Sequence, residues 1–241
     1  MRNWEKTYRS SPHAAICEAT FWKVLADRVI EVEPNEELTG AAQRPDYRCK
    51  KDGQEFYVEV TCVLTATASK KTALSATLPD RRLHPFDIWG FNRAVNAECQ
   101  NKVKQCANLG APCLLAIGTF HSMVSTACVK KVLLSGILTG DVGIGWKVDP
   151  SQRGESEKTN FVTDLQNAAF LYAANQAIQS RRSPLSGLLI GGFGVIPWRK
   201  LGILHPKPIH EFDTKLLDDI EFCRLQHDLH SGLLKTKWSR R

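Results

Sequence analysis

The sequence has eight cysteines but no Cys-x-x-Cys pair, and its seven histidines do not gather near them. Zinc ribbons and fingers need such spacings, so the pattern argues against a structural zinc site. Most of the cysteines stand among apolar neighbours, as in Thr61-Cys62-Val63. We therefore expect reduced, buried cysteines.

Long apolar runs are also missing. None reaches the roughly 18 residues of a membrane-spanning helix, and the longest candidate, 186–198, is short and rich in glycine. Residues 1–12 are polar and charged, so we expect no signal peptide, no membrane partner and a cytoplasmic location. The segment Gly191-Gly192-Phe193-Gly194 lacks the spacing of a dinucleotide-binding loop.

The composition is that of a globular protein. The 241 residues are 43% hydrophobic and 24% charged, which excludes wholesale disorder, a coiled-coil rod and a collagen-like fibre. The net charge of +7 suits either a polyanionic partner or a solvated basic surface. Basic pairs occur at 70–71, 81–82, 130–131, 181–182 and 240–241. The six tryptophans are scattered, and each could stack on a base or pack against the protein.

The periodicity predicts an α/β domain over 1–241. An apolar stripe that includes Phe21, Trp22, Leu25 and Val29 predicts a helix over 12–29. Asp52-Gly53 predicts a hairpin between strands at 44–50 and 55–63. Next come a loop at 64–80, a helix at 86–109 and a buried strand at 111–120. The expected order beyond 120 is a helix at 123–138, a loop at 140–158, a partly helical segment at 160–179, strands at 185–196 and 201–205, and a helix at 213–229. This order predicts a mixed sheet with helices on both faces.

Five residues form the candidate site. Asp46 begins one strand arm, and Glu59 and Thr61 share a face of the other. Glu18 lies in the middle of the first helix's apolar stripe, and Lys102 near the centre of the stripe of the 86–109 helix. Acidic side chains brought together hold hard cations such as Mg²⁺, which activate water and neutralise a phosphate.

Each residue also has a structural interpretation. Glu18 could form a salt bridge with Arg44 or Arg48. Asp46 could cap a turn, and Glu59 could face solvent from its strand. Lys102 could extend to the surface. His121, just after the buried strand, could lie near the same site or be incidental.

The sequence contains Arg44-Pro45-Asp46, which is followed after twelve residues by Glu59-Val60-Thr61 in an apolar strand. This pattern resembles the PD-(D/E)xK nuclease superfamily. The resemblance covers about 16–120 by element order. The chain is also similar to uncharacterised bacterial proteins with Arg-Pro-Asp-Phe before a Tyr-Val-Glu-Val strand and a late Asn-Pro or His-Pro segment, here Leu204-His205-Pro206. The resemblance to the superfamily implies a restriction-endonuclease-like sheet. Its core lies at about 12–120, and an extension at about 121–241 packs on that core. The implied activity is Mg²⁺-dependent hydrolysis of nucleic-acid phosphodiesters, with Mn²⁺ as a substitute and DNA as the favoured substrate.

The sequence departs from the family at Thr61, where a lysine is usual. Members of the superfamily can relocate this lysine to the following helix, which makes Lys102 the candidate and Lys104 the second choice. By the resemblance, Asp46 and Glu59 bind the metal, Glu18 binds it directly or through water, and Thr61 orients water.

Two other function classes stay open. The threonine also suits a catalytically silent module of the same fold that binds nucleic acid or a protein. A structural scaffold without a nucleic-acid partner would lack a basic surface beside the acidic site.

Overall fold

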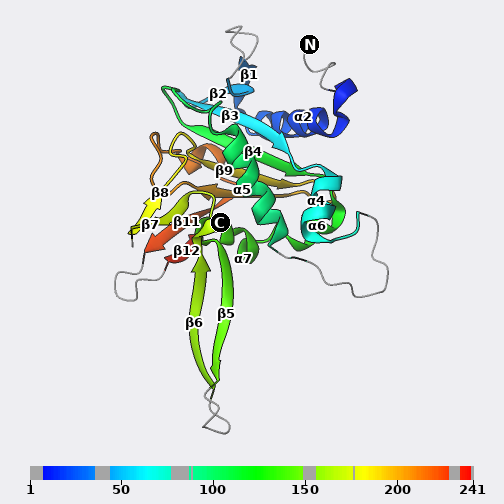
Figure 1. Cartoon of the computed structure of the whole chain (residues 1–241). Coiled ribbons are helices and arrows are strands. Elements are labelled where there is room, and N and C mark those ends of the chain that lie inside the picture. Colours follow the sequence, from blue (N-terminus) through cyan, green and yellow to red (C-terminus); the bar gives the residue numbers. More distant parts are fainter. Residues whose placement is uncertain are drawn as a thin grey trace.

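One mixed sheet of eight strands forms the centre of the chain, in the order β1-β2-β3-β4-β9-β10-β11-β12 (Figure 1). The computed structural model describes residues 8–35, 44–76, 87, 89–148, 156–175, 177–227 and 234–239. The strands of this sheet are β1 (Glu31–Pro34), β2 (Tyr47–Lys51), β3 (Gln54–Cys62), β4 (Cys113–Thr119), β9 (Gly187–Gly192), β10 (Arg199–Leu204), β11 (Glu221–His227) and β12 (Leu234–Trp238). The mixed α/β fold predicted from the sequence is confirmed.

Strand direction places three carboxyl ends together. β3, β4 and β9 run parallel, whereas β2 and β10 are antiparallel to their neighbours β3 and β9. β11 is parallel to β10. We call the end where β3, β4 and β9 finish, and where β2, β10 and β11 begin, the site end of the sheet.

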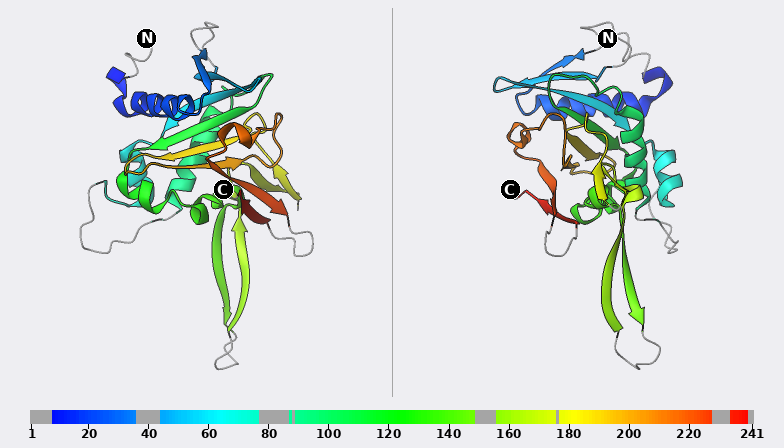
Figure 2. Two further views of the ribbon diagram at one scale, coloured as in Figure 1. Left: turned by 180° about the vertical axis from the view of Figure 1, so that it is seen from behind. Right: turned by 60° about the vertical axis from the view of Figure 1, so that its left-hand side comes forward.

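Helices cover both faces of the sheet (Figure 2). On one face α2 (Pro12–Ala26) packs Phe21 and Leu25 against the β3 residues Phe56, Val58 and Val60. On the other face lie α4 (Thr65–Thr72), α5 (Gly90–Lys102), α6 (Ser122–Ala127), α7 (Lys131–Leu134) and α8 (Gly136–Thr139). The alternation along β3 is as predicted, and it leaves Tyr57, Glu59 and Thr61 on the α5 face.

Two smaller hairpins complete the described structure. β5 (Asp141–Val148) and β6 (Ser156–Asp164) form a long antiparallel arm that projects from the sheet (Figures 1 and 2). β7 (Leu171–Ala174) pairs with β8 (Ala177–Ser180). Short 3₁₀ turns lie at η1 (Leu165–Asn167) and η2 (Thr214–Leu217).

The predicted β2–β3 hairpin is confirmed. Tyr47 pairs with Val58 and Lys51 with Gln54 in antiparallel register. Asp52 and Gly53 both have positive φ, at 50° and 76°. This backbone matches the twist of the flanking strands and explains the preference for Asp-Gly.

Several predicted elements were wrong. The segment 64–80 contains the helix α4, 141–148 and 156–164 are strands, 171–174 and 177–180 form a hairpin, and 221–227 is a strand rather than a helix. The predicted helix over 123–138 is divided into α6, α7 and α8, and α5 ends at Lys102 rather than near 109. Residues 86 and 88 of that prediction lie outside the described residues. Strand pairing overrides local helical preference at β11, because β10 otherwise has no neighbour on that side.

The buried face of α2 is rotated from the predicted stripe. Trp22 is 46% exposed and Val29, beyond the helix end, is 88% exposed. Cys17, Thr20 and Val24 are buried instead. The prediction was misled by extending the helix three residues past Ala26.

Candidate active site at the ends of β2 and β3

Asp46 lies immediately before β2, at the site end of the sheet. The β2–β3 pairing stops at Tyr47 and Val58, so the next outward amide of β3 has no strand partner there. The side chain of Asp46 supplies the acceptor that a strand neighbour would otherwise provide, because its Oδ2 accepts a hydrogen bond from the Val60 N–H at 2.7 Å. The buried Asn35 holds the same segment, because its Nδ2 donates to the Pro45 carbonyl at 3.0 Å and its N–H to the Asp46 carbonyl at 2.8 Å.

Glu59 is the most buried acidic residue of the site, with 1% of its surface exposed. The Lys102 ammonium of α5 donates to its Oε1 at 2.7 Å. The other oxygen, Oε2, is buried and accepts no hydrogen bond from the part of the chain that the structure describes. An unpaired buried carboxylate oxygen is costly, and it marks the place where a cation could bind.

The electrostatics of Glu59 follow from this position. Burial, and then the charge of Asp46, raise the pKa of Glu59 to about 8 against the opposing charge of Lys102. Burial lowers the pKa of Lys102, but the charge of Glu59 and the hydrogen bond between them hold it above its usual value. Two nearby carboxylates repel, and the charge of Asp46 is accordingly the second cause of the raised pKa of Glu59. Burial contributes more to the shift than carboxylate repulsion does.

The helix α5 supplies a residue that sequence reasoning missed. The Thr61 hydroxyl donates to Glu98 Oε2 at 2.9 Å. Glu98 precedes Lys102 by four residues, so both side chains face β3, where Thr61 follows Glu59 by two. This spacing was visible in the sequence and could have indicated Glu98 as soon as Lys102 was placed.

Lys102 and Lys104 have different surroundings, as the sequence predicts, although Lys104 lies beyond the end of α5. Lys102 reaches Glu59, and 28% of its side chain remains exposed. Lys104 lies in the turns that follow α5 and is exposed to solvent. The structure therefore brings Asp46, Glu59 and Lys102 together and leaves Lys104 outside.

Glu18 approaches from the other face of the sheet. It is partly buried on α2, and after burial its charge and that of Asp46 raise the pKa of Tyr47. Arg48, one of its predicted partners, instead donates to Glu55 at 2.7 Å. A role for Glu18 as a metal ligand remains a prediction.

No family model matches this chain, and neither a curated protein nor a solved structure matches it.

The side chains of the site must meet the coordination requirements of Mg²⁺ if they are to hold it. Within the described ranges, no three acidic, histidine or cysteine side chains are grouped so that they could hold a metal ion. Mg²⁺ in phosphoryl-transfer sites is often held by one or two carboxylates, with waters and substrate oxygens completing the shell. Asp46 and Glu59, with the unpaired Oε2, fit that smaller requirement.

The two histidines noted in the sequence have structural roles. His121 lies at the site end, where its Nδ1 accepts from the Val124 N–H at 3.2 Å and its Nε2 lies 3.0 Å from Ser69 Oγ. It therefore ties α4 to α6. His205, at the opposite end of the sheet after β10, accepts from the Lys207 N–H at 2.9 Å and lies 2.9 Å from the Arg181 carbonyl.

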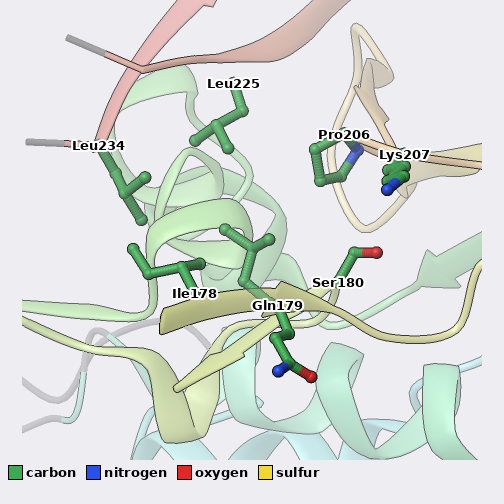
Figure 3. Close-up of a pocket in the computed structure, with 8 residues that line it drawn as sticks. Ile178, Gln179, Ser180, Pro206, Lys207, Leu225 and Leu234 are labelled. Atoms are coloured by element: carbon green, nitrogen blue, oxygen red, sulfur yellow. The ribbon is translucent and has the colours of Figure 1, made fainter. Parts of the chain in front are cut away.

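A separate cavity of about 790 Å³ lies between the β7–β8 hairpin and the β11–β12 strands (Figure 3). Its lining consists of Leu171, Ile178, Gln179, Ser180, Pro206, Lys207, Leu225 and Leu234. None of these is acidic, so the cavity is not part of the carboxylate site. Among the described residues, no helix is long and apolar enough to cross a membrane.

Proposed function

We propose that the chain is a Mg²⁺-dependent nuclease that hydrolyses phosphodiesters, with DNA as the first substrate to test. The observation that carries the proposal is the Glu59–Lys102 contact of 2.7 Å beside Asp46, with Glu59 Oε2 left without a hydrogen bond. A carboxylate pair can hold a metal ion, and a lysine beside it can stabilise the negative charge that develops on the phosphate. The eight free cysteines suit a reducing, cytoplasmic location.

In this proposal Asp46 and Glu59 hold the metal. The bound ion would lower the pKa of its water and neutralise charge on the scissile phosphate. Asp46 is fixed by the Val60 N–H, so its carboxylate is oriented before any ligand arrives.

Lys102 supplies the cation that the Thr61 position lacks. Its partial exposure allows the ammonium to reach a phosphate oxygen or the attacking water while it stays beside Glu59. The Thr61 hydroxyl donates its proton to Glu98, so its oxygen is free to accept a hydrogen bond from that water.

The test is cleavage of plasmid and of single-stranded DNA with Mg²⁺ or Mn²⁺. We expect activity in the wild type, and loss of it in Asp46→Asn and in Glu59→Gln. Glu31→Gln, which removes an exposed carboxylate of β1, is the matched control and should cut like the wild type. A chelator should abolish all cleavage.

A catalytically silent binding module is the alternative, and the uncharged Thr61 favours it. In that case no divalent metal supports cleavage, and Asp46→Asn and Glu59→Gln bind nucleic acid or a protein partner like the wild type. Such a result would overturn the proposed nuclease activity.

A further inference from the structure

A second feature lies at the site end of the sheet, three strands away from Glu59. A pocket of about 490 Å³ lies between the start of β10 and the α6–α7 connection. Its charged and aromatic lining consists of Lys130, Lys131, Trp198, Arg199, Lys200 and Asp219. We call it the basic pocket.

Topology places the basic pocket on the same end as the carboxylates. Arg199 begins β10 opposite Gly192, the last residue of β9, and β9 runs parallel to β4 and β3. The β9–β10 turn is also bound to α6, since the Gly194 N–H donates to Ser125 Oγ at 3.0 Å. From β3 to β10 there are three strand spacings, or about 14 Å across the sheet. The register makes Glu59 level with Ile203, so Arg199 lies four residues, or about 13 Å, further along the strands towards the site end.

The charge of the pocket is positive. It has four cationic side chains and one carboxylate, Asp219, which accepts from Arg28 Nε at 2.6 Å. Lys131 contacts Glu221 at 2.6 Å, while Lys130 is exposed to solvent. Arg199 is oriented by a 3.2 Å bond from its Nη1 to the Thr126 carbonyl.

Trp198 adds an aromatic surface to these cations. Its ring meets Phe193 edge to face, with centroids 5.3 Å apart, and 40% of the residue remains exposed. Phe193 is itself buried against Phe21 at 5.2 Å. The indole is therefore held in place at the pocket while part of it faces solvent.

We propose that the basic pocket binds an unpaired nucleic-acid strand, with the cations on its phosphates and a base stacked on Trp198. An unstacked base is required, because bases within a duplex already stack on one another. The proposal rests on the proposed nuclease function for its link to the carboxylates. The two offsets together separate Arg199 from Glu59 by about 20 Å. An extended strand covers this separation with a few nucleotides, so a strand held in the basic pocket runs on to the scissile phosphate.

The test is binding in a chelator, where no cleavage occurs. Fluorescence anisotropy would compare a labelled single-stranded 20-mer with the same sequence as a duplex. We expect Trp198→Ala to weaken single-strand binding about fivefold or more and Trp198→Phe to retain most of it. Duplex binding should not depend on Trp198.

Lys130→Gln tests the charge without touching the core, since Lys130 is exposed. It should weaken binding and lower the slope of log Kd against log salt by about 0.7. Lys215→Gln is the matched control, because it removes an exposed lysine of η2 at the opposite end of the sheet. If Lys130→Gln and Lys215→Gln both bind like the wild type, the basic pocket is not the binding site.

Two other results would also overturn the proposal. The first is equal dependence of single-strand and duplex binding on Trp198. The second is a poly-glutamate peptide bound as tightly as the oligonucleotide through Lys130 and Trp198, which would identify a docking site for an acidic protein.

The two proposals fail separately. Pocket-dependent binding by a wild type that never cuts would reject the nuclease and keep the strand-binding pocket. Cleavage by a wild type whose binding ignores Lys130 and Trp198 would reject only the pocket.

Discussion

Lys102 and Glu59 form the residue pair on which the proposed chemistry depends. Lys102→Ala should reduce Mg²⁺-dependent cleavage by about a hundredfold or more, because it removes the positive charge that contacts Glu59. Lys104→Ala should cut like the wild type, since Lys104 lies beyond the end of α5 and is exposed to solvent. Initial rates on a short DNA substrate measure both.

Thr61→Lys extends this experiment. It restores a lysine on the strand at the position that is usual in the resembling family. If the helix lysine has taken over that role, Thr61→Lys should recover part of the activity of Lys102→Ala. A fully active Lys102→Ala enzyme would contradict the relocation.

The raised pKa of Glu59 predicts a pH dependence of stability without metal. The folded protein keeps a proton on Glu59 up to a pH of about 8, whereas the unfolded chain releases it near 4.5. This contribution to the free energy of unfolding is therefore complete below 4.5 and is lost as the pH rises towards 8 and above. Urea denaturation at several pH values in a chelator would show the decline.

Two variants separate the causes of that decline. Glu59→Gln should remove it, because the side chain no longer titrates. Asp46→Asn should reduce it only in part, since burial is the larger cause of the shift. A stability that is flat between pH 5 and 8.5 in all three proteins would show that Glu59 is ionised throughout.

At the scale of elements, the β2–β3 hairpin depends on its turn. Gly53 has φ of 76°, and an added Cβ would meet no atom within 4 Å. Gly53→Ala should therefore destabilise the fold by about 1 kcal/mol through backbone strain alone. Asp52→Asn is the control, because asparagine also accepts positive φ. The midpoints of urea denaturation measure both variants, and the cleavage rate of the folded protein should not change.

The elements nearest the site were the easiest to predict, for physical reasons. β3 alternates strictly, and Asp52-Gly53 is a strong turn signal, so the sequence placed Glu59 and Thr61 on one face. In the 213–229 segment Phe222 packs on the α2 side of the sheet and Cys223 on the α5 side, whereas Arg224 and Gln226 are exposed. Two adjacent buried residues break the period of two in the hydrophobicity of β11, so the segment resembled a helix.

Some of the site residues were predictable from the sequence, and others were not. Lys102 followed from the helical stripe, but its contact with Glu59 depends on how α5 packs over β3. Glu98 was missed because its partner is a hydroxyl rather than a charge. The basic pocket joins residues around 130, 199 and 219, which only the order β4-β9-β10-β11 brings together. The basic pairs at 81–82 and 240–241 lie outside the described residues.

At the scale of the whole molecule, Mg²⁺ should stabilise the folded chain. A ligand that binds only the folded state raises stability by about 2.7 kcal/mol at a hundred times its Kd. The melting temperature should thus rise with Mg²⁺ or Mn²⁺ in the wild type and not in a double variant with Asp46→Asn and Glu59→Gln. An equal rise in both proteins would place the bound ion elsewhere.

The parallel neighbours of β4 have a consequence for synthesis on the ribosome. β4 is buried along its whole length, yet one of its two partners, β9, begins about seventy residues later in the chain. At roughly 5–20 residues per second, the nascent chain carries an apolar strand with one unpaired edge for several seconds before β9 is made. Such a strand can pair with other chains, so a polypeptide released after residue 125 should be insoluble and captured by chaperones. The Glu59–Lys102 site can thus be complete in sequence well before the sheet that supports it can close.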